Sequence, residues 1–138
     1  MATVLIIEDN PANMKLTSLL LCNAGHTVLC AVDAEIGLTL ARDDQPDLIL
    51  MDLQLPGMDG LAATALLKRA PATAAIPVIA LTAMAMKEDR EKSKAAGCDA
   101  YIAKPVRYKE LYAAIDILLA KSVARAVSKE NLSHQVTP

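Results

Sequence analysis

The sequence contains no phenylalanine and no tryptophan, and its aromatic side chains are three tyrosines in 138 residues. Hydrophobic residues nevertheless make up 54% of the chain. We therefore expect a core of Leu, Ile, Val, Ala and Met side chains. The length is suited to one domain with a core of its own.

Long apolar runs and basic clusters are absent as well. No run reaches the roughly 18 apolar residues of a membrane-spanning helix, and no basic segment precedes the first apolar residues, so we expect neither membrane insertion nor secretion. The formal net charge is −2, with Lys and Arg scattered along the chain, which argues against direct nucleic-acid binding. The cysteines are odd in number, and we expect Cys22, Cys30 and Cys98 to be small buried residues in a reducing compartment, the cytoplasm.

Five short apolar segments alternate with five segments of helical pattern. This alternation predicts an α/β fold, a doubly wound five-stranded parallel sheet of the (βα)5 type with helices on both faces. The predicted strands are residues 3–7, 26–32, 48–52, 76–82 and 101–103. The predicted helices are residues 11–24, 34–42, 61–69 and 84–96, with a last helix that ends near residue 121.

Hydrophobic spacing also predicts the buried helix faces. The helix at 84–96 offers only Met and Ala to a core, so little burial energy should hold it in place. In the other helices the expected inward residues are Leu16, Leu20, Leu21 and Ala24, then Ile36 and Leu40, and finally Leu111, Ile115, Leu118 and Leu119.

Polar side chains mark the carboxyl ends of four predicted strands. They are Glu8 and Asp9 after the first, Asp52 at the end of the third, Thr82 at the end of the fourth and Lys104 after the fifth. These ends meet at one edge of a parallel sheet, where three carboxylates repel one another unless a cation offsets them. An all-oxygen set suits Mg²⁺, which also accepts phosphate oxygens.

Together these groups provide what the formation of an acyl phosphate requires. The Asp52 carboxylate attacks phosphorus as the nucleophile. A metal ion and Lys104 neutralise the charge on the phosphoryl oxygens, and Thr82 donates a hydroxyl. The alternative, that these side chains are only caps and salt bridges, requires five suitable residues to fall on four strand ends by chance.

These motifs resemble the receiver domain of two-component response regulators (the CheY-like superfamily) over residues 3–121. The residues at positions 13–14 and 83–87 look most like those of stand-alone, cell-division-type (DivK-like) receivers and of the receivers of hybrid histidine kinases. The resemblance implies the flavodoxin-like strand order 2-1-3-4-5, a receiver domain at 1–122, and a helix extension with a disordered tail at 123–138. The matching segments are Glu8-Asp9-Asn10, Met51-Asp52, Leu55-Pro56-Gly57-Met58-Asp59-Gly60, Leu81-Thr82-Ala83 and Tyr101-Ile102-Ala103-Lys104-Pro105.

The resemblance also implies a role for each site residue. Asp52 is the modified residue, and Thr82 and Lys104 contact the phosphoryl oxygens. Tyr101 changes rotamer as Thr82 moves, and the bond before Pro105 is cis, a geometry that proline permits. The implied Mg²⁺ ligands are Asp9, Asp52, the backbone carbonyl of Gln54 and, largely through water, Glu8. The implied partner-docking residues are Asn13, Met14 and Pro105.

The implied function is that of a single-domain response regulator, a signalling module that catalyses only its own phosphorylation and dephosphorylation. A histidine kinase or a histidine phosphotransfer protein would donate the phosphoryl group, and a downstream protein would read the change. We expect a monomer or a weak dimer. The alternative within the family is a receiver detached from a hybrid histidine kinase that acts as a phosphorelay intermediate.

Two functions outside the family fit the sequence less well. A haloacid-dehalogenase-type phosphohydrolase needs a second Asp two residues after its nucleophile, where this chain has Gln54. A flavodoxin-like electron carrier needs aromatic rings and a phosphate loop after the first strand. Here that loop begins with Glu8 and Asp9, which repel phosphate unless a metal intervenes.

Overall fold

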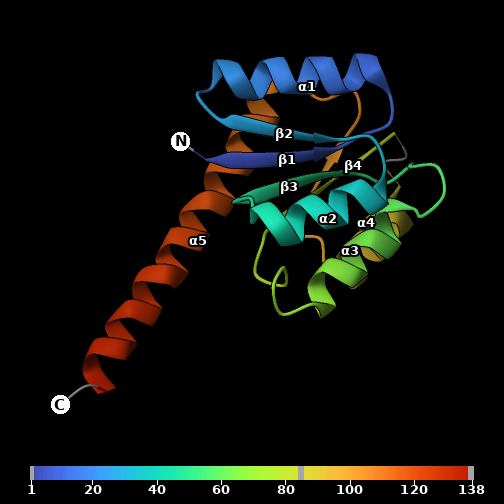
Figure 1. Cartoon of the computed structure of the whole chain (residues 1–138). Helices are drawn as coiled ribbons and strands as arrows, with labels where there is room; N and C mark the ends of the chain where they lie inside the picture. Colours follow the sequence, from blue (N-terminus) through green and yellow to red (C-terminus); the bar gives the residue numbers. More distant parts are fainter. Residues whose placement is uncertain (1, 84–85, 137–138) are drawn as a thin grey trace.

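The computed structural model describes residues 2–83 and 86–136, with side chains described up to residue 122. Within this part, five parallel strands form one sheet in the order β2-β1-β3-β4-β5, as predicted (Figure 1). In chain order the elements are β1 (Thr3–Ile7), α1 (Pro11–Asn23), β2 (Thr27–Ala31), α2 (Ala34–Asp44), β3 (Leu48–Asp52), α3 (Gly60–Arg69), β4 (Val78–Thr82), α4 (Lys87–Ala96), β5 (Ala100–Ala103) and α5 (Tyr108–Val136).

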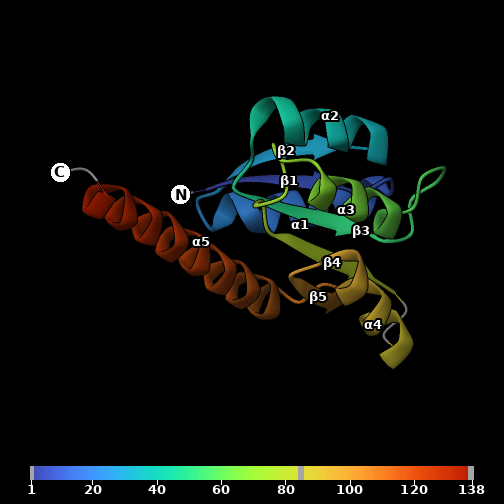
Figure 2. The ribbon, with the colours of Figure 1, turned by 90° about the horizontal axis from the view of Figure 1, so that it is seen from below.

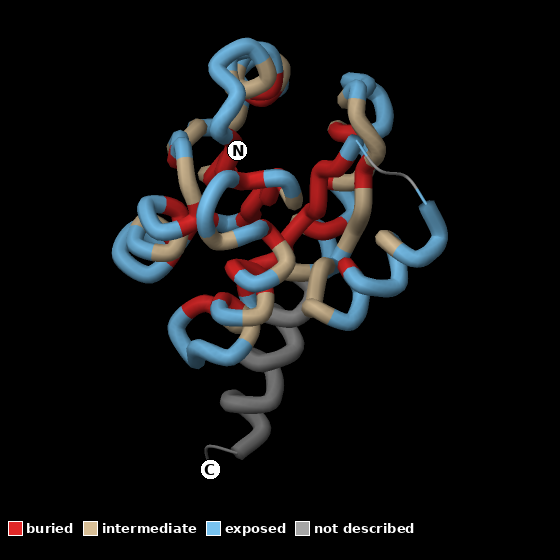
Figure 3. Tube along the Cα trace, turned by 90° about the vertical axis from the view of Figure 1, so that its right-hand side faces the viewer, coloured by how far each residue is buried: buried red, intermediate tan, exposed pale blue. Residues whose placement is uncertain are grey.

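The core has two halves, one on each face of the sheet. Alternate residues of β1 point to opposite faces, so that Leu5 and Ile7 pack with residues of α2 and α3, while Val4 and Ile6 pack with residues of α1 and α5. Figure 2 shows α2 and α3 on the opposite side of the sheet from α5. Figure 3 shows buried segments in the interior of the Cα trace, with exposed segments around them. The central strands therefore hold their carboxyl ends rigidly.

Side-chain caps begin three of the helices and fix the direction in which each leaves the sheet. Asn10 accepts a hydrogen bond from the backbone N–H of Asn13 at 3.1 Å, and Pro11 occupies the first turn of α1. Asp33 caps α2 at 2.8 Å, and Asp59 caps α3 at 2.8 Å. Each cap contributes about 1 kcal/mol to stability. The caps at Asn10 and Asp33 confirm the helix starts predicted from the sequence.

Two of the predicted helix faces are rotated in the structure. In α1, Leu16 is 48% exposed and Ala24 is exposed, whereas Thr17 and Leu21 are buried. Threonine is polar, so hydrophobic spacing does not reveal the inward position of Thr17. The face predicted for α5 is confirmed, since Leu111, Ile115 and Leu118 are buried and Leu119 packs against them.

The face of α2 is set by close approach to the sheet. Ile36, predicted to be buried, is 43% exposed, while Gly37 and Ala41 face the core. A Cβ atom on Gly37 would lie 2.4 Å from Cδ1 of Ile7. Small residues therefore allow α2 to pack tightly on β1, and a pattern based on large apolar residues cannot detect such a face.

The prediction that all three cysteines are buried is wrong for two of them. Cys22 and Cys30 are exposed, and Cys98 is half-buried. Cys30 belongs to β2, which is an edge strand with little burial, and Cys22 lies on the outer side of α1. Position in the sheet thus outweighs the general preference of cysteine for the interior.

Helix α4 contributes little to the core, as its sequence predicts. Its buried residue is Ser93, whose hydroxyl donates to the carbonyl of Asp89 at 2.9 Å. Residues 84–85, where this helix was predicted to begin, lie outside the described residues. At the other end of the chain, α5 runs to Val136 and so continues past residue 121, near which the sequence predicted the last helix to end. The division of the chain at residue 122 and the disordered tail stay predictions.

Glycine allows α3 to begin directly against the end of β3. A Cβ atom on Gly60 would lie 2.3 Å from the carbonyl oxygen of Asp52 and 2.7 Å from Cα of Leu53. Both are backbone atoms that cannot easily move aside. The start of α3 therefore fixes the loop that carries Asp52.

None of the helices in the described part combines the length and the apolar character that crossing a membrane requires.

Candidate functional site

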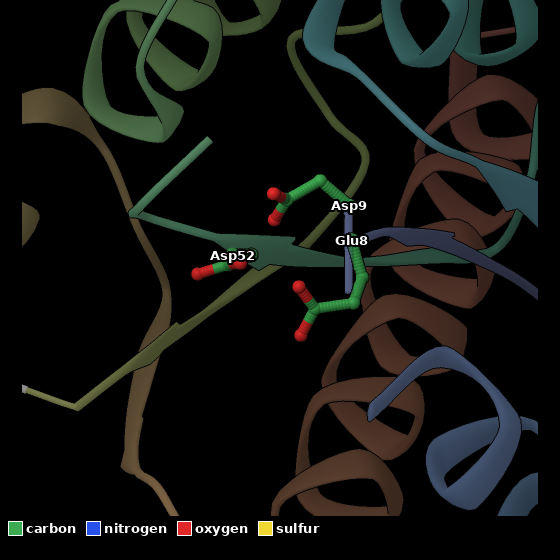
Figure 4. A group of neighbouring side chains, drawn as sticks. All are labelled: Glu8, Asp9 and Asp52. Carbon is green, nitrogen blue, oxygen red and sulfur yellow. The ribbon is translucent and has the colours of Figure 1, made fainter. Parts of the chain in front are cut away.

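Three carboxyl groups meet at the carboxyl edge of the sheet (Figure 4). Glu8 and Asp9 follow β1, and Asp52 is the last residue of the neighbouring strand β3. One oxygen atom from each side chain lies within 4.8 Å of the other two. Glu8 and Asp52 are each 2% exposed, whereas Asp9 faces solvent. The cluster is thus closed on the side of the sheet and open to a ligand from solution.

Lys104 brings a positive charge to this cluster from the end of β5. Its Nζ atom lies 3.0 Å from Oε1 of Glu8 and 3.3 Å from Oδ1 of Asp52. The Lys104 side chain is 17% exposed, so these ion pairs are only partly screened by water. The structure therefore brings Lys104 together with the three carboxylates, across 96 residues of sequence from Glu8.

The two buried carboxyl groups have opposite pKa shifts. The pKa of Glu8 is raised from 4.5 to about 7, mainly by burial and also by the hydrogen bond with Asp52, against the opposing effect of Lys104. Burial also acts to raise the pKa of Asp52, but hydrogen bonds from Glu8 and from the backbone N–H of Gln54, together with Lys104, hold it below its ordinary value. In the metal-free protein Glu8 therefore holds a proton below about pH 7, while Asp52 is ionised.

The neighbouring carboxyl groups keep the ammonium of Lys104 charged. Burial acts to lower its pKa, but the hydrogen bond to Glu8 and the charge of Asp52 outweigh burial and raise the pKa above its ordinary value. The site therefore contains a fixed cation beside an ionised carboxylate. This arrangement suits a nucleophile whose attack on phosphorus creates negative charge.

Backbone groups complete the cluster. The N–H of Gln54 donates to Oδ1 of Asp52 at 3.0 Å, and the N–H of Asn10 donates to Oε2 of Glu8 at 3.3 Å. Gln54 thus lies next to Asp52, although its carbonyl as a metal ligand stays a prediction. The donor set, carboxylate and carbonyl oxygens with an open side, fits a hard divalent cation such as Mg²⁺.

Thr82 and Tyr101 form a second group beside the cluster. Thr82, at the end of β4, is buried, and its carbonyl accepts from the backbone N–H of Lys104 at 2.7 Å. Partial burial and the charge of Asp89 raise the pKa of Tyr101, whereas Arg90 and a hydrogen bond with Thr82 act to lower it. Thr82 is therefore hydrogen-bonded both to the backbone of Lys104 and to Tyr101. Their roles as switch residues stay predictions.

Two of the predicted docking residues border the cluster directly. Asn13 and Pro105 line a cavity of about 60 Å³ together with Glu8 and Lys104. The bond between Lys104 and Pro105 is cis, as the resemblance implied. Met14 is half-buried and packs against the core from α1. Docking at these positions stays a prediction.

An apolar groove, which the sequence did not predict, continues from this cavity. Its volume is about 630 Å³, and it lies between α1 and the start of α5. Leu16 and Val106 line both the cavity and the groove. The sequence predicted Leu16 to be buried. A prediction that turned Thr17 toward the core would have placed Leu16 at the surface. The residues that line the groove are Leu16, Leu20, Val106, Arg107, Tyr108, Lys109 and Glu110.

The raised pKa of Glu8 predicts how stability depends on pH in the metal-free protein. Between about pH 4.5 and 7, folded Glu8 keeps its proton while unfolded Glu8 releases it, so folding takes up a proton. The free energy of unfolding should therefore fall as pH rises through this window, by on the order of 2 kcal/mol, and Glu8→Gln should remove this fall. The shift of Asp52 acts below its ordinary pKa of 3.8, outside the window.

Urea unfolding in EDTA at pH 5 and pH 8, followed by circular dichroism, measures this difference. Glu91→Gln, at an exposed position of α4, is the matched control and should keep the wild-type dependence. An equal fall in stability in Glu8→Gln and wild type would contradict the assignment of the proton to Glu8.

The sequence is similar to known signalling proteins over most of its length. The profile of the response regulator receiver domain matches residues 4–116. The polar-differentiation response regulators DivK of Brucella anthropi and Brucella abortus are each 47% identical over 104 residues, which cover 75% of this chain and 85% of the relative.

Solved structures with the same fold include receiver domains. A putative response regulator from Chloroflexus aurantiacus has a TM-score of 0.83 and 30% identity, over 86% of this chain and 98% of its own. The receiver domain of a sensor histidine kinase from Pseudomonas aeruginosa, with a magnesium ion coordinated in its active-site cleft, has a TM-score of 0.81 and 34% identity over the same shares. A CheY-like receiver domain protein from Methanospirillum hungatei has a TM-score of 0.84 and 29% identity, over 91% of this chain and 98% of its own.

The match covers both the sheet and the carboxyl edge at which the acidic cluster and Lys104 meet. The chain therefore belongs to the response regulator receiver domain family of two-component signalling proteins.

Proposed function

We propose that the protein is a cytoplasmic phosphoacceptor in which Asp52 takes a phosphoryl group from a phosphohistidine. The donor is a histidine kinase or a histidine phosphotransfer protein, and the modified protein changes its binding to a downstream protein. The observation that carries this proposal is the ionised Asp52 carboxylate, held beside the ammonium of Lys104 at an otherwise acidic and solvent-open edge.

The transfer is a displacement at phosphorus. An oxygen of Asp52 forms the new P–O bond while the P–N bond of the phosphohistidine breaks, and its electron pair returns to the imidazole nitrogen, which takes up a proton. Lys104, 3.3 Å from Asp52, neutralises charge on the phosphoryl oxygens. Because the phosphohistidine supplies the whole phosphoryl group, the reaction needs no further substrate. The protein itself is the molecule that becomes modified.

A divalent cation fits this site for electrostatic reasons. Asp9, Asp52 and the carbonyl of Gln54 would hold Mg²⁺ directly, with Glu8 acting largely through water. When bound, the ion supplies positive charge to the phosphoryl oxygens and offsets the repulsion among the carboxylates. The related Pseudomonas receiver domain with magnesium in its cleft supports this choice of ion.

The output is a shift between two conformations of the same fold. The phosphoryl group adds negative charge and acceptor oxygens, which attract the hydroxyl of Thr82. A change at Thr82 alters the position of Tyr101, with which it shares a hydrogen bond. Going from 1% to 99% of the switched state requires about 5.5 kcal/mol of differential interaction with the phosphoryl group.

Replacing the acceptor tests this proposal. Asp52→Asn should abolish labelling by radioactive acetyl phosphate, because the neutral amide is a poor nucleophile for phosphorus. Removal of Mg²⁺ by EDTA should reduce the labelling of wild type at least tenfold. Asp43→Asn, at an exposed surface position of α2, is the control and should behave as wild type. Undiminished labelling of Asp52→Asn would refute the proposal.

We further propose that a helix carrying the donor histidine docks in the groove between α1 and α5. The donor must reach Asp52, and the groove leads through Leu16 and Val106 to the cavity that Asn13, Pro105 and Lys104 line. An apolar floor of this kind accepts the apolar face of a helix. Arg107 and Lys109 outnumber Glu110 on the lining, which favours acidic side chains on the donor.

Substitutions of two leucines of α1 test donor docking separately from phosphoryl transfer to Asp52. Leu16→Asp should slow transfer from a phosphorylated histidine phosphotransfer protein about tenfold or more, because a charge would enter the apolar contact. Labelling by acetyl phosphate should stay within about twofold of wild type. Leu19→Asp, at a 53% exposed position outside the groove, is the matched control. Equal effects of the two substitutions on protein-mediated transfer would exclude the groove as the docking site.

A further inference from the structure

We propose that Arg90 is a positioning residue that holds the ring of Tyr101 in the arrangement of the unphosphorylated protein. The guanidinium carbon of Arg90 lies 5.5 Å from the centroid of the Tyr101 ring. This contact joins the exposed side of α4 to β5. The inference rests on the proposed function of Asp52, because it concerns the equilibrium that phosphorylation would shift.

The residues that directly follow α4 are held in place without Arg90. Lys68 of α3 donates to the Asp99 carboxylate at 3.0 Å and to the carbonyl of Ile76 at 2.8 Å. Asp99 also accepts from the backbone N–H of Val78 at 2.8 Å. Gly97 ends the helix with φ of +105° and lies close to the Lys68 side chain. A Cβ atom on Gly97 would lie 2.7 Å from Cγ of Lys68. This end therefore acts as a fixed point.

The amino-terminal half of α4 lacks comparable apolar anchors among its described residues. Its residues before Ser93 are charged, and Arg90 and Glu91 are exposed. Burial of apolar surface therefore contributes little free energy to holding this half of the helix in place. Single polar contacts account for a larger share of that free energy. The contact of Arg90 with Tyr101 is such a contact, and it lies in the second turn of the helix. Figure 2 shows α4 next to β5, the strand that carries Tyr101.

Tyr101 connects this contact to the acidic site. Its hydrogen bond with Thr82 reaches the end of β4, and the backbone carbonyl of Thr82 accepts from the N–H of Lys104. A displacement of Thr82 toward a phosphoryl group would move the tyrosine ring relative to Arg90. The ring would then lie farther from the guanidinium in the switched arrangement, and the cation–π contact would be weakened there. The contact therefore stabilises the unphosphorylated arrangement relative to the switched one.

The size of the effect follows from the exposure of Arg90. Cation–π contacts at exposed sites correspond to about a two- to fivefold change in an equilibrium constant. Loss of the contact should therefore increase the rate of Asp52 labelling by acetyl phosphate about two- to fivefold, because more molecules would populate the phosphorylation-competent state. Global stability should barely change, since the position is exposed.

The test compares Arg90→Gln, Arg90→Lys and the control Lys92→Gln in the full chain. Lys92 is an exposed cation of the same helix that makes no cation–π contact with Tyr101. The three tyrosines of the chain give three side-chain NMR signals after selective labelling, those of Tyr101, Tyr108 and Tyr112. Signals are recorded with and without beryllofluoride and Mg²⁺, and labelling rates are measured with acetyl phosphate.

In wild type, beryllofluoride with Mg²⁺ should shift the Tyr101 signal. Arg90→Gln should move this signal part of the way without beryllofluoride and raise the labelling rate two- to fivefold. Arg90→Lys should give an intermediate result, and Lys92→Gln should match wild type. Identical signals and rates in Arg90→Gln and Lys92→Gln would overturn the inference. A Tyr101 signal in wild type that does not respond to beryllofluoride would overturn the proposed movement of Tyr101, and the inference with it. Failure of acetyl phosphate to label wild type would instead overturn the proposed function.

Discussion

The arrangement of the protein depends on the repulsion among three carboxylates that the sheet forces together at one edge. Two of them, Glu8 and Asp52, are buried, and the ammonium of Lys104 offsets part of their charge at 3.0 and 3.3 Å. Burial raises the pKa of Glu8, whereas hydrogen bonds and Lys104 hold the pKa of Asp52 below its ordinary value, so Glu8 binds a proton more readily than Asp52. The negative charge that remains creates the demand for a divalent cation at the open side, next to Asp9. A reactive carboxylate and an affinity for metal thus arise from the same group of crowded carboxyl groups.

The sheet supplies this geometry because its interior leaves no alternative register. Residues 4–7 of β1 and all of β3 are buried, and a shift of one position would exchange the side chains that pack in the two halves of the core. Lys104 reaches the cluster from β5 on the other side of β4. The close packing of Gly60 on the carbonyl of Asp52 then fixes the loop that follows the acceptor. The stability of the aliphatic core is therefore used to hold charges in an unfavourable arrangement.

The fold class, the strand order and the meeting of Glu8, Asp9, Asp52 and Lys104 could all be anticipated from the sequence. Apolar runs that end in charged residues predict the fold class and the meeting of these side chains, because parallel strands align their carboxyl ends. The strand order follows from the resemblance to receiver domains. Helix faces were less accessible. Thr17 is buried although it is polar, and Gly37 faces the core because only a glycine fits against Ile7. The exposure of Cys22 and Leu16, and with it the groove beside α1, depends on these rotations and on tertiary packing, which hydrophobic spacing does not encode.

The polar helix α4 shows how a stable sheet can support a movable surface. Its one described buried side chain is Ser93, and its position depends on contacts at its two ends rather than on a core of its own. The central claim, that the acidic edge holds a cation and presents Asp52 to phosphorus, is tested most directly by a crystal structure grown with Mg²⁺ and beryllofluoride. The account predicts beryllofluoride on Asp52 with Lys104 in contact, and the ion bound by Asp9 and Asp52. An ion bound elsewhere, or a Lys104 side chain turned to solvent, would contradict it.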